Sequence, residues 1–248
     1  MKFNTNSNVY IITYSVVMVV LVAVLLAFAA LALKPRQDAN ELNEKKTQIV
    51  KALGYDAEKV SYDEVVAEAA LLNAEGAVVN GDVAKVFAAL QDVKSSCEAG
   101  EFPIFKATDG SVVIPLYGAG LWGPIWGYIA LEPDMNTVKG IVLDHKGETP
   151  GLGAEIATPK HQEMYVKKSV YEGDELVGII LKKGGATKDA EGNVDVNEVD
   201  AITGGTKTSD GVSAMIKDCL ESYEPYFEAA KAATSEASNE LNTENNGK

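Results

Sequence analysis

Two adjacent glycines flanked by threonines stand directly before the most strongly amphipathic segment of the chain. The stretch runs from Asp200 to Ser209 and contains Thr203, Gly204, Gly205 and Thr206. Glycines let the backbone approach a ligand closely, and a helix start offers free N–H groups and a partial positive charge. This combination suits a phosphate group. An ordinary glycine-rich turn is the alternative, because neither the Walker spacing nor the Gly-x-Gly-x-x-Gly dinucleotide pattern is present.

A second glycine-bearing stretch, residues 147–155, reads Gly-Glu-Thr-Pro-Gly-Leu-Gly-Ala-Glu and lies between a predicted strand and a predicted helix. Its glycines and proline fix a tight backbone path, and we expect the apolar Leu152 near the surface of that path. On spacing alone, a strand-to-helix turn is the simpler explanation, and a binding loop is the alternative.

Histidine and cysteine are scarce. The only residues of these types are Cys97, Cys219, His145 and His161, too few and too scattered for a Cys/His metal cage or an iron–sulfur site. We therefore expect no metal site within this chain. A disulfide between the two cysteines stays open, although Cys219 falls on an apolar helical stripe that favours a plain core thiol.

The elements that must position the two stretches mix strands with helices. Strands are predicted at 102–107 and 111–116 around an Asp-Gly turn, at 126–131 and 137–143 around a turn at 133–136, and at 176–182. Thr158 opens a helix towards Lys168, and apolar spacing predicts another over 212–223, with Thr208 or Ser209 as its N-cap. Because prolines remove ladder donors, Pro103 and Pro115 place the first strand pair at a sheet edge.

Residues 38–100 have the pattern of a mainly helical segment. Ser61 and Glu64 have the spacing of a capping box, which predicts a helix running through Asn73. Gly54 and Gly76 stand where helices would stop, and a further short helix is predicted around residues 86–93. We expect a packed helical connector here.

Tyr10 to Leu33 is a run of 24 residues without a charge. As a helix it would be about 36 Å long, enough to span the roughly 30 Å hydrocarbon layer of a membrane. A cleaved signal peptide is the alternative, but the apolar stretch is long for one and Lys2 is a thin basic region. Because more basic residues follow the run than precede it, the positive-inside rule alone keeps the following domain in the cytoplasm.

The rest of the chain is acidic. Beyond residue 33 it has 21 basic and 36 acidic residues, a formal charge of −15. Such a surface repels the phosphate backbone of nucleic acids, so we expect no nucleic-acid partner. The predicted fold is one transmembrane helix, a helical connector and an α+β domain. The expected divisions are 1–9 (N-terminal segment), 10–33 (transmembrane helix), 34–100 (connector), 101–231 (α+β domain) and 232–248 (disordered tail).

Taken together, the two glycine-bearing stretches resemble a known family. Their Glu-Thr-Pro-Gly-Leu-Gly and Asp-x-x-Thr-Gly-x-Thr signatures, in this order, are similar to those of an FMN-binding domain. That domain is shared by the C subunit of the sodium-translocating NADH:quinone oxidoreductase and the G subunit of the Rnf complex. The resemblance runs from about Phe102 to Tyr223. Gly120-Leu121-Trp122-Gly123 and the long segment before Glu101 favour the C subunit of the sodium pump.

The resemblance implies how the cofactor is attached. In the family, a magnesium-dependent flavin transferase takes FMN from FAD and joins its phosphate to the last threonine of the second signature, here Thr206. Asp200 occupies the acidic start of that signature and would be read by the transferase. Gly205 stands where the family often has alanine. No base such as histidine lies nearby in sequence to activate a threonine hydroxyl, which favours an external enzyme. The remaining cofactor-binding residues that the resemblance implies are Trp122, Thr149, Leu152, Thr203, Gly204 and Gly205.

The implied function is electron transfer through covalent FMN within a membrane complex that oxidises NADH, reduces quinone and pumps sodium ions. The chain would work with the other subunits and would not be catalytic alone. The family places the flavin domain on the outer, periplasmic side of the bacterial inner membrane, against the charge rule, and we follow the family. The alternatives are a role like that of the G subunit in an Rnf-type complex and a non-redox, membrane-anchored anion-binding module.

Overall fold

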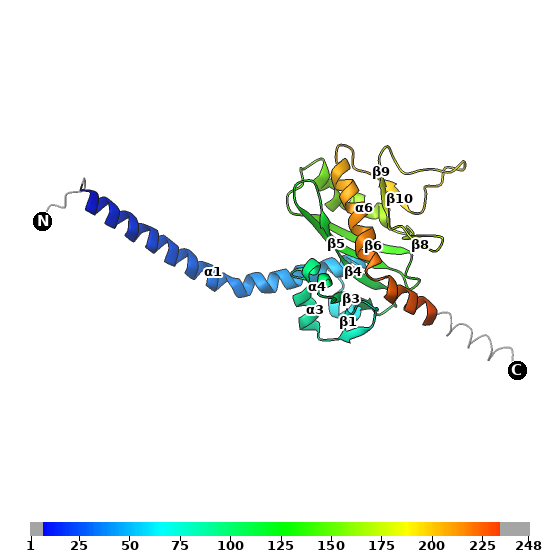
Figure 1. The fold of residues 1–248 in the computed structure, drawn as a ribbon, viewed down its shortest axis with the longest axis horizontal. Coiled ribbons are helices and arrows are strands. Elements are labelled where there is room, and N and C mark those ends of the chain that lie inside the picture. The colour runs from blue at the N-terminus through cyan, green and yellow to red at the C-terminus, as the bar shows by residue number, and fades with distance from the viewer. Residues whose placement is uncertain (1–6, 234–248) are drawn as a thin grey trace. The chain divides into compact units, whose positions relative to one another are not determined.

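The computed structural model describes residues 7–233 and divides the chain into two units, residues 1–45 and 46–248. The predicted tail 232–248 lies, from residue 234 on, outside the described residues, as do residues 1–6 of the N-terminal segment. The first unit consists of most of helix α1 (Asn8–Ala52; Figure 1). Its apolar part has a mean hydropathy of 3.2 over 18 residues and none of that window is buried. The helix is long and apolar enough to cross a membrane, and it includes the predicted span 10–33.

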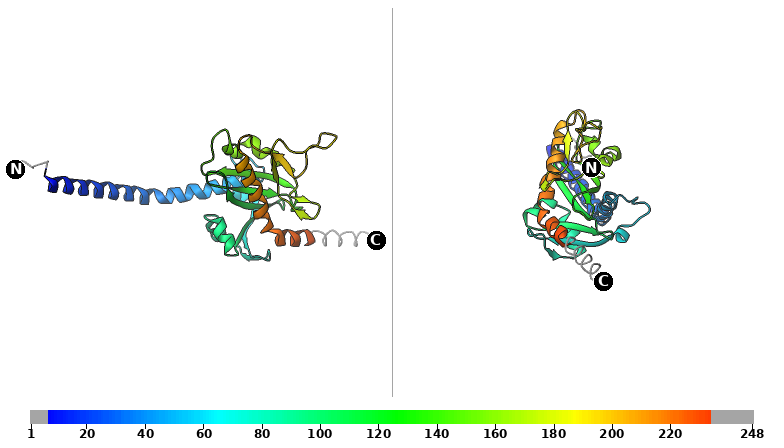
Figure 2. Two further views of the ribbon diagram at one scale, coloured as in Figure 1. Left: turned by 45° about the horizontal axis from the view of Figure 1, so that its top comes forward. Right: turned by 90° about the vertical axis from the view of Figure 1, so that its right-hand side faces the viewer.

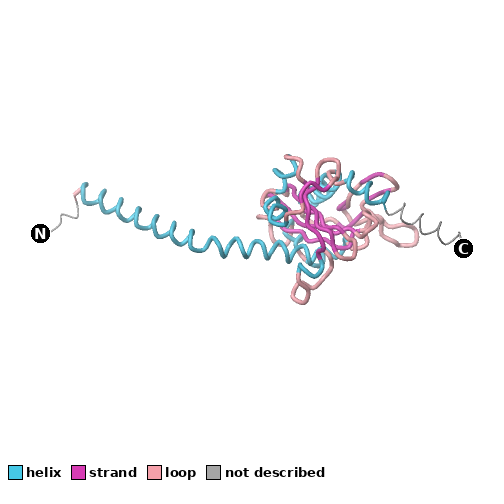
Figure 3. Tube along the Cα trace, turned by 90° about the horizontal axis from the view of Figure 1, so that it is seen from below, coloured by secondary structure: helices cyan, strands magenta, loops and turns pink. Residues whose placement is uncertain are grey.

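The second unit is built on one antiparallel sheet of six strands in the order β2-β1-β3-β4-β5-β6. Figure 1 labels β1, β3, β4, β5 and β6 of this sheet, and Figure 3 draws the strands in magenta among the helices. The strands are β1 (Val66–Leu72), β2 (Val78–Asn80), β3 (Phe102–Ala107), β4 (Val112–Ala119), β5 (Pro124–Leu131) and β6 (Val138–His145). Two small sheets complete the set: β7 (Tyr171–Glu172) with β8 (Glu175–Leu176), and β9 (Ile180–Lys182) with β10 (Glu198–Asp200). The expected α+β fold class is confirmed.

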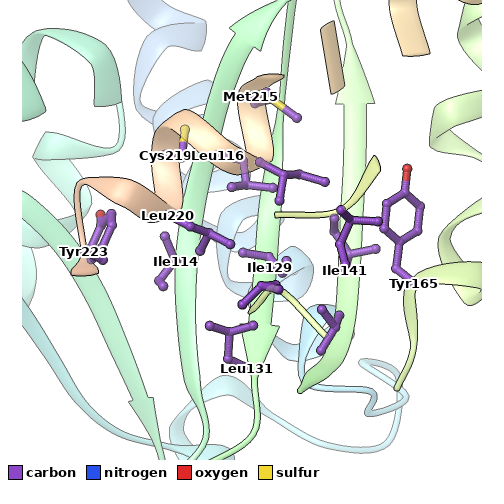
Figure 4. Packing of buried hydrophobic residues seen from close by; sticks show 14 of the residues in the cluster. Ile114, Leu116, Ile129, Leu131, Ile141, Tyr165, Met215, Cys219, Leu220 and Tyr223 are labelled. Carbon is purple, nitrogen blue, oxygen red and sulfur yellow. The ribbon is translucent and has the colours of Figure 1, made fainter. Parts of the chain in front are cut away.

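Both faces of the main sheet are buried, which explains why its central strands are apolar almost throughout. On one face lies α6 (Thr206–Glu221), drawn in orange in Figure 2. Its Met215, Cys219 and Leu220 pack against residues of β4 and β5 such as Ile114 and Ile129 (Figure 4). The other face is covered by the end of α1, by α2 (Tyr62–Val65) and by α3 (Val83–Ala89), where a second apolar cluster forms. The unit also contains α4 (Val93–Glu98), the 3-10 helices η1 (Gly153–Ala157) and η2 (Glu163–Tyr165), and α5 (Pro159–Gln162), and a helical stretch at 224–233 follows α6.

The helix predicted from Ser61 through Asn73 was wrong beyond its first turn. Residues 62–65 are helical, but Val66–Leu72 form a strand that pairs with β2 and β3. Apolar residues of this run suit either structure, and the pairing buries Ala69 and Leu71 on one face of the sheet and Ala70 and Leu72 on the other. Gly76 accordingly lies in the β1–β2 turn, not at a helix end.

The sheet-edge position predicted for Pro103 and Pro115 was also wrong, because β3 and β4 lie inside the sheet. The β3–β4 ladder is paired only next to its turn, where Phe105 faces Val113. Continuing that register places the two prolines opposite each other, where the ladder has already ended. The missing N–H groups are therefore accommodated by an opening between two interior strands rather than by an outer edge.

Smaller differences follow from glycines and caps. The predicted strand 176–182 is interrupted at Gly178, whose φ of 69° breaks the extended path between β8 and β9. Thr158 caps α5 as expected, but the helix ends at Gln162 and continues only as η2. Gly54 follows the end of α1 with a φ of 82°, as a helix-ending glycine does.

Candidate functional site

Three loops meet at the end of the sheet that contains the last residues of β4 and β6. They are the β4–β5 loop (residues 120–123), the loop after β6 (146–152) and the loop before α6 (201–205). A Cβ atom on Gly204 would lie 2.7 Å from the side chain of Leu152, and one on Gly205 would lie 3.3 Å from the backbone nitrogen of Gly153. The structure therefore brings the two glycine-bearing stretches into direct contact, which their sequence separation does not reveal.

Helix α6 begins at Thr206, with Gly205 at the N-cap. The predicted caps, Thr208 and Ser209, were wrong, since both lie inside the first turn. The Ser209 N–H bonds to the Gly205 carbonyl at 2.8 Å. The N–H groups of the three residues before it, 206–208, donate to no acceptor within residues 7–233. Free amides at the start of a 16-residue helix form a site suited to an anion such as phosphate.

Two hydroxyl side chains at this helix start already form hydrogen bonds within the protein. Thr208 donates to Glu148 at 2.6 Å, and the Ser209 hydroxyl accepts the N–H of Ile202 at 3.1 Å. Among the described residues, the hydroxyl of Thr206 has no hydrogen-bond partner, and its side chain is half-buried. Thr206 is therefore the available hydroxyl in the first turn of α6.

Large apolar side chains stand exposed on two of the loops. Leu121, Trp122 and Leu152 are 53%, 69% and 41% exposed, respectively. Exposed apolar surface next to an anion site can contact the apolar part of a bound ligand. Thr149 is exposed on the same loop as Leu152, and its carbonyl accepts the Leu152 N–H at 3.1 Å.

Gly204 has a φ of 76°, a conformation that side chains with a Cβ atom rarely adopt. It is exposed, as is Thr203, whereas Gly205 is buried against the loop after β6. These three residues thus form the backbone turn that brings Thr206 to the helix start.

Asp200 lies apart from these contacts. It is exposed at the end of β10, and its carboxylate accepts the N–H of Ala186 at 2.8 Å. The hydrogen bond orders the turn after β9 rather than the glycine-bearing loops.

The remaining residues of catalytic type are separate from the site. His161 is buried and its Nε2 lies 3.0 Å from the Tyr165 hydroxyl. Cys97 and Cys219 are free thiols, and burial raises their pKa values to about 11 and about 12. Within residues 7–233, no group of three or more histidine, cysteine or acidic side chains is arranged to hold a metal ion.

Glu148 and Thr208 were missed as members of the site by sequence reasoning. Glu148 begins the first signature and is only 5% exposed, while Thr208 lies just after the second signature and is 1% exposed. Nothing in the spacing links them. Only the fold shows that the two side chains bond across 60 positions of the sequence.

The class of protein follows from the site and from comparison with known families. Residues 120–221, which contain all three loops and α6, match the FMN-binding domain family. The fold, with its free helix start and adjoining apolar surface, agrees with that class.

Similar proteins then give the particular family. The chain is 31% identical to the C subunit of the Na(+)-translocating NADH-quinone reductase of Haemophilus ducreyi, over 93% of this chain and 97% of the relative. It is 37% identical to the corresponding subunit of Pasteurella multocida over 72% of this chain and 63% of that one. The crystal structure of the same subunit from Parabacteroides distasonis superposes with a TM-score of 0.68 at 36% identity, covering 79% of this chain and 96% of that one. The chain belongs to the family of Na(+)-translocating NADH-quinone reductase C subunits, as its two signatures predicted.

Proposed function

We propose that this chain is the FMN-carrying electron-transfer subunit of a sodium-translocating NADH-quinone reductase and that FMN is joined through its phosphate to Thr206. The family and its FMN-binding domain support the electron-transfer role. The observation that carries the attachment site is the unoccupied Thr206 hydroxyl beside three free amides at the start of α6.

The proposed attachment transfers the FMN half of FAD to the hydroxyl of Thr206. The Thr206 oxygen bonds to the phosphorus of the FMN half of FAD, the bond to the AMP half breaks, AMP leaves, and the hydroxyl proton passes to a base of the transferase. An external enzyme is needed because a threonine hydroxyl is a weak nucleophile and, within residues 7–233, no base accepts a hydrogen bond from it. The product is a phosphodiester with one negative charge, which the amides and partial positive charge of the helix start stabilise.

The remaining site residues take their proposed roles from position. Trp122 and Leu152 offer exposed apolar surface to the flavin ring, and Thr149 offers polar atoms beside it. Thr203, Gly204 and Gly205 form the turn that admits the phosphate. Asp200 is exposed, as recognition by the flavin transferase requires.

Bound FMN supplies the redox chemistry, and the protein supplies its position and electrostatic surroundings. NADH would be oxidised on another subunit, and this chain would relay the electrons within the complex, with no catalysis of its own. The apolar part of α1 would anchor it in the bacterial inner membrane, with the second unit on the periplasmic side. The other subunits and the flavin transferase are its proposed partners.

The attachment site can be tested by producing the chain together with the flavin transferase and examining the denatured protein on a gel under ultraviolet light. The parent chain should give a fluorescent band, and Thr206→Ala should give a dark band at normal abundance. Thr108→Ala is the matched control, since it removes an exposed hydroxyl from the β3–β4 turn, away from the three loops of the site, and it should keep its flavin. A fluorescent Thr206→Ala band would reject Thr206 as the acceptor.

A variant at Asp200 tests the recognition step separately. Asp200→Asn retains a side-chain oxygen for the Ala186 N–H but removes the charge, so the fold should persist while flavin incorporation falls severalfold. Equal flavin loading of variant and parent would remove Asp200 from the recognition surface.

A further inference from the structure

Glu148 is a buried carboxylate that uses each of its oxygens on a different part of the site. Oε1 accepts the backbone N–H of Trp122 at 2.8 Å, and Oε2 accepts the hydroxyl of Thr208 at 2.6 Å. Its own backbone N–H donates to Nδ1 of His145 at 3.2 Å. Among the described residues, no lysine, arginine or histidine forms an ion pair with it. Hydrogen bonds therefore satisfy this charge in place of a cation.

Two glycines make room for this carboxylate. A Cβ atom on Gly120 would lie 2.5 Å from Oε1, and one on Gly153 would collide with Oε2 and with the Thr208 hydroxyl. Gly120 belongs to the β4–β5 loop and Gly153 to the start of η1. The absence of side chains at both positions lets three separate segments close around a single acidic group.

We infer that Glu148 is a positioning residue of the flavin site, a clamp that holds the Trp122 loop against the first turn of α6. Trp122 carries exposed apolar surface, and Thr206 lies two residues before Thr208 in the same helical turn. The clamp therefore fixes the separation between the surface that would face the flavin ring and the oxygen that would carry its phosphate. The cofactor part of this inference rests on the proposed function, whereas the clamp itself belongs to the chain without flavin.

Amide hydrogen exchange of Trp122, followed by NMR in chain produced without the flavin transferase, tests the clamp directly. Glu148→Ala removes the acceptor, so exchange of the Trp122 N–H should rise about tenfold to a hundredfold, the range expected for losing a hydrogen bond to a charged group. Glu148→Gln keeps an oxygen for the Trp122 N–H and should stay within about tenfold of the parent. Glu155→Ala is the matched control, because Glu155 is a carboxylate of the neighbouring segment that bonds to Gly151 instead. It should leave Trp122 unchanged.

Thr208→Val provides a second route if Glu148→Ala does not fold. It preserves the side-chain shape and removes only the donor to Oε2, so the carboxylate loses its anchor on α6 and Trp122 exchange should again increase. Unchanged Trp122 exchange in both Glu148→Ala and Thr208→Val, or in whichever of them folds, would overturn the clamp.

In the flavin-loaded chain, the midpoint potential of the flavin distinguishes a positioning role from a purely structural one, which would leave the potential unchanged. The midpoint potential of the flavin in Thr208→Val should shift from that of the parent, while Glu172→Ala, which removes an exposed carboxylate of β7 outside the three loops, should match the parent. If the amide exchange rate of Trp122 changes while the midpoint potential of the flavin does not, Glu148 holds the loop without positioning the flavin. That result would overturn the inference. Absence of flavin on the parent chain would instead reject the proposed function, while the exchange result still judges the clamp.

Discussion

At the scale of single residues, three buried polar side chains of the second unit differ in how well their hydrogen bonds are satisfied. His161 has a tyrosine hydroxyl as its partner, and Tyr223 donates to the Pro103 carbonyl at 2.7 Å. The hydroxyl of Tyr62 is buried with no hydrogen-bond partner within the described residues. A buried polar group without a partner costs stability, whereas a partnered one is costly to remove. These three sites therefore respond differently to substitution and to pH.

Acidification should destabilise the fold through His161. Burial, opposed by the nearby Glu155 charge, lowers the pKa of His161 from 6.5 to about 4. Between these values the unfolded chain binds the proton and the folded chain does not, so the free energy of unfolding falls as pH drops from 6.5 towards 4. The loss reaches about 3 kcal/mol at most. Comparing His161→Gln with the parent by chemical unfolding across this range isolates the effect, since the variant should show a shallower pH dependence. Parallel pH profiles would contradict the assignment.

Removing the buried hydroxyl of Tyr62 and that of Tyr223 should affect the free energy of unfolding differently. Tyr62→Phe keeps the ring contacts with Phe87 and Phe105 and deletes the unpartnered hydroxyl, so the free energy of unfolding should be unchanged or raised by about 1 kcal/mol. Tyr223→Phe leaves the buried Pro103 carbonyl without its donor and should cost about 1–3 kcal/mol. Urea unfolding of the two variants beside the parent measures both. Equal destabilisation by the two substitutions would be inconsistent with this hydrogen-bond assignment.

At the scale of elements, the segment expected to be a helical connector contributes to the sheet. Strand β1 lies between β2 and β3, and the end of α1 covers the face of the sheet opposite α6. Ile49 near the end of that helix and Leu53 directly after it are 0% and 1% exposed. The three loops of the candidate site are thus supported by a sheet that is complete only when residues before 101 are present.

A fragment covering residues 46–233 should therefore fold, whereas a fragment covering 101–233 should not. The shorter fragment loses β1 and the helices over one face, which exposes the edge of β3 and apolar residues such as Phe105. Circular dichroism and thermal unfolding of the two purified fragments distinguish them. A cooperative transition of similar midpoint in both would show that the earlier segment is dispensable.

The sequence predicted the local features better than the long-range ones. Turn chemistry correctly located the hairpin at Gly110, where φ is 87°, and the apolar spacing correctly located α6. Strand β1 was missed because Ala and Leu suit a helix in isolation and become a strand only through pairing with β3. For the site, the signatures predict Thr206 as the flavin acceptor, whereas Glu148 was missed because its partners are 26 and 60 residues away.

At the scale of the whole molecule, the membrane orientation rests on two opposed arguments. The basic residues after the apolar part of α1 favour a cytoplasmic second unit, whereas the proposed function places it outside. Flavin attachment by an enzyme of the outer side requires that Thr206 be reachable there. Other subunits of a complex can hold a single helix against its own charge bias.

The proposed periplasmic orientation predicts that protease added outside the inner membrane reaches the second unit. In cells whose outer membrane has been permeabilised, added protease should cleave exposed loops such as residues 188–194 while the inner membrane stays intact. A cytoplasmic protein serves as the control for membrane integrity. Cleavage only after the inner membrane is lysed would place the second unit in the cytoplasm.

The proposed function depends on a covalent bond between FMN and one oxygen atom, and the mass of the peptide that contains Thr206 shows whether this bond is present. The chain should be purified from the membranes of its own host, digested and measured by tandem mass spectrometry. We predict that this peptide carries the added mass of FMN less one water, with the fragments assigning it to Thr206. A peptide of unmodified mass, or one modified at Thr203 or Thr208 instead, would exclude Thr206 as the residue that carries FMN.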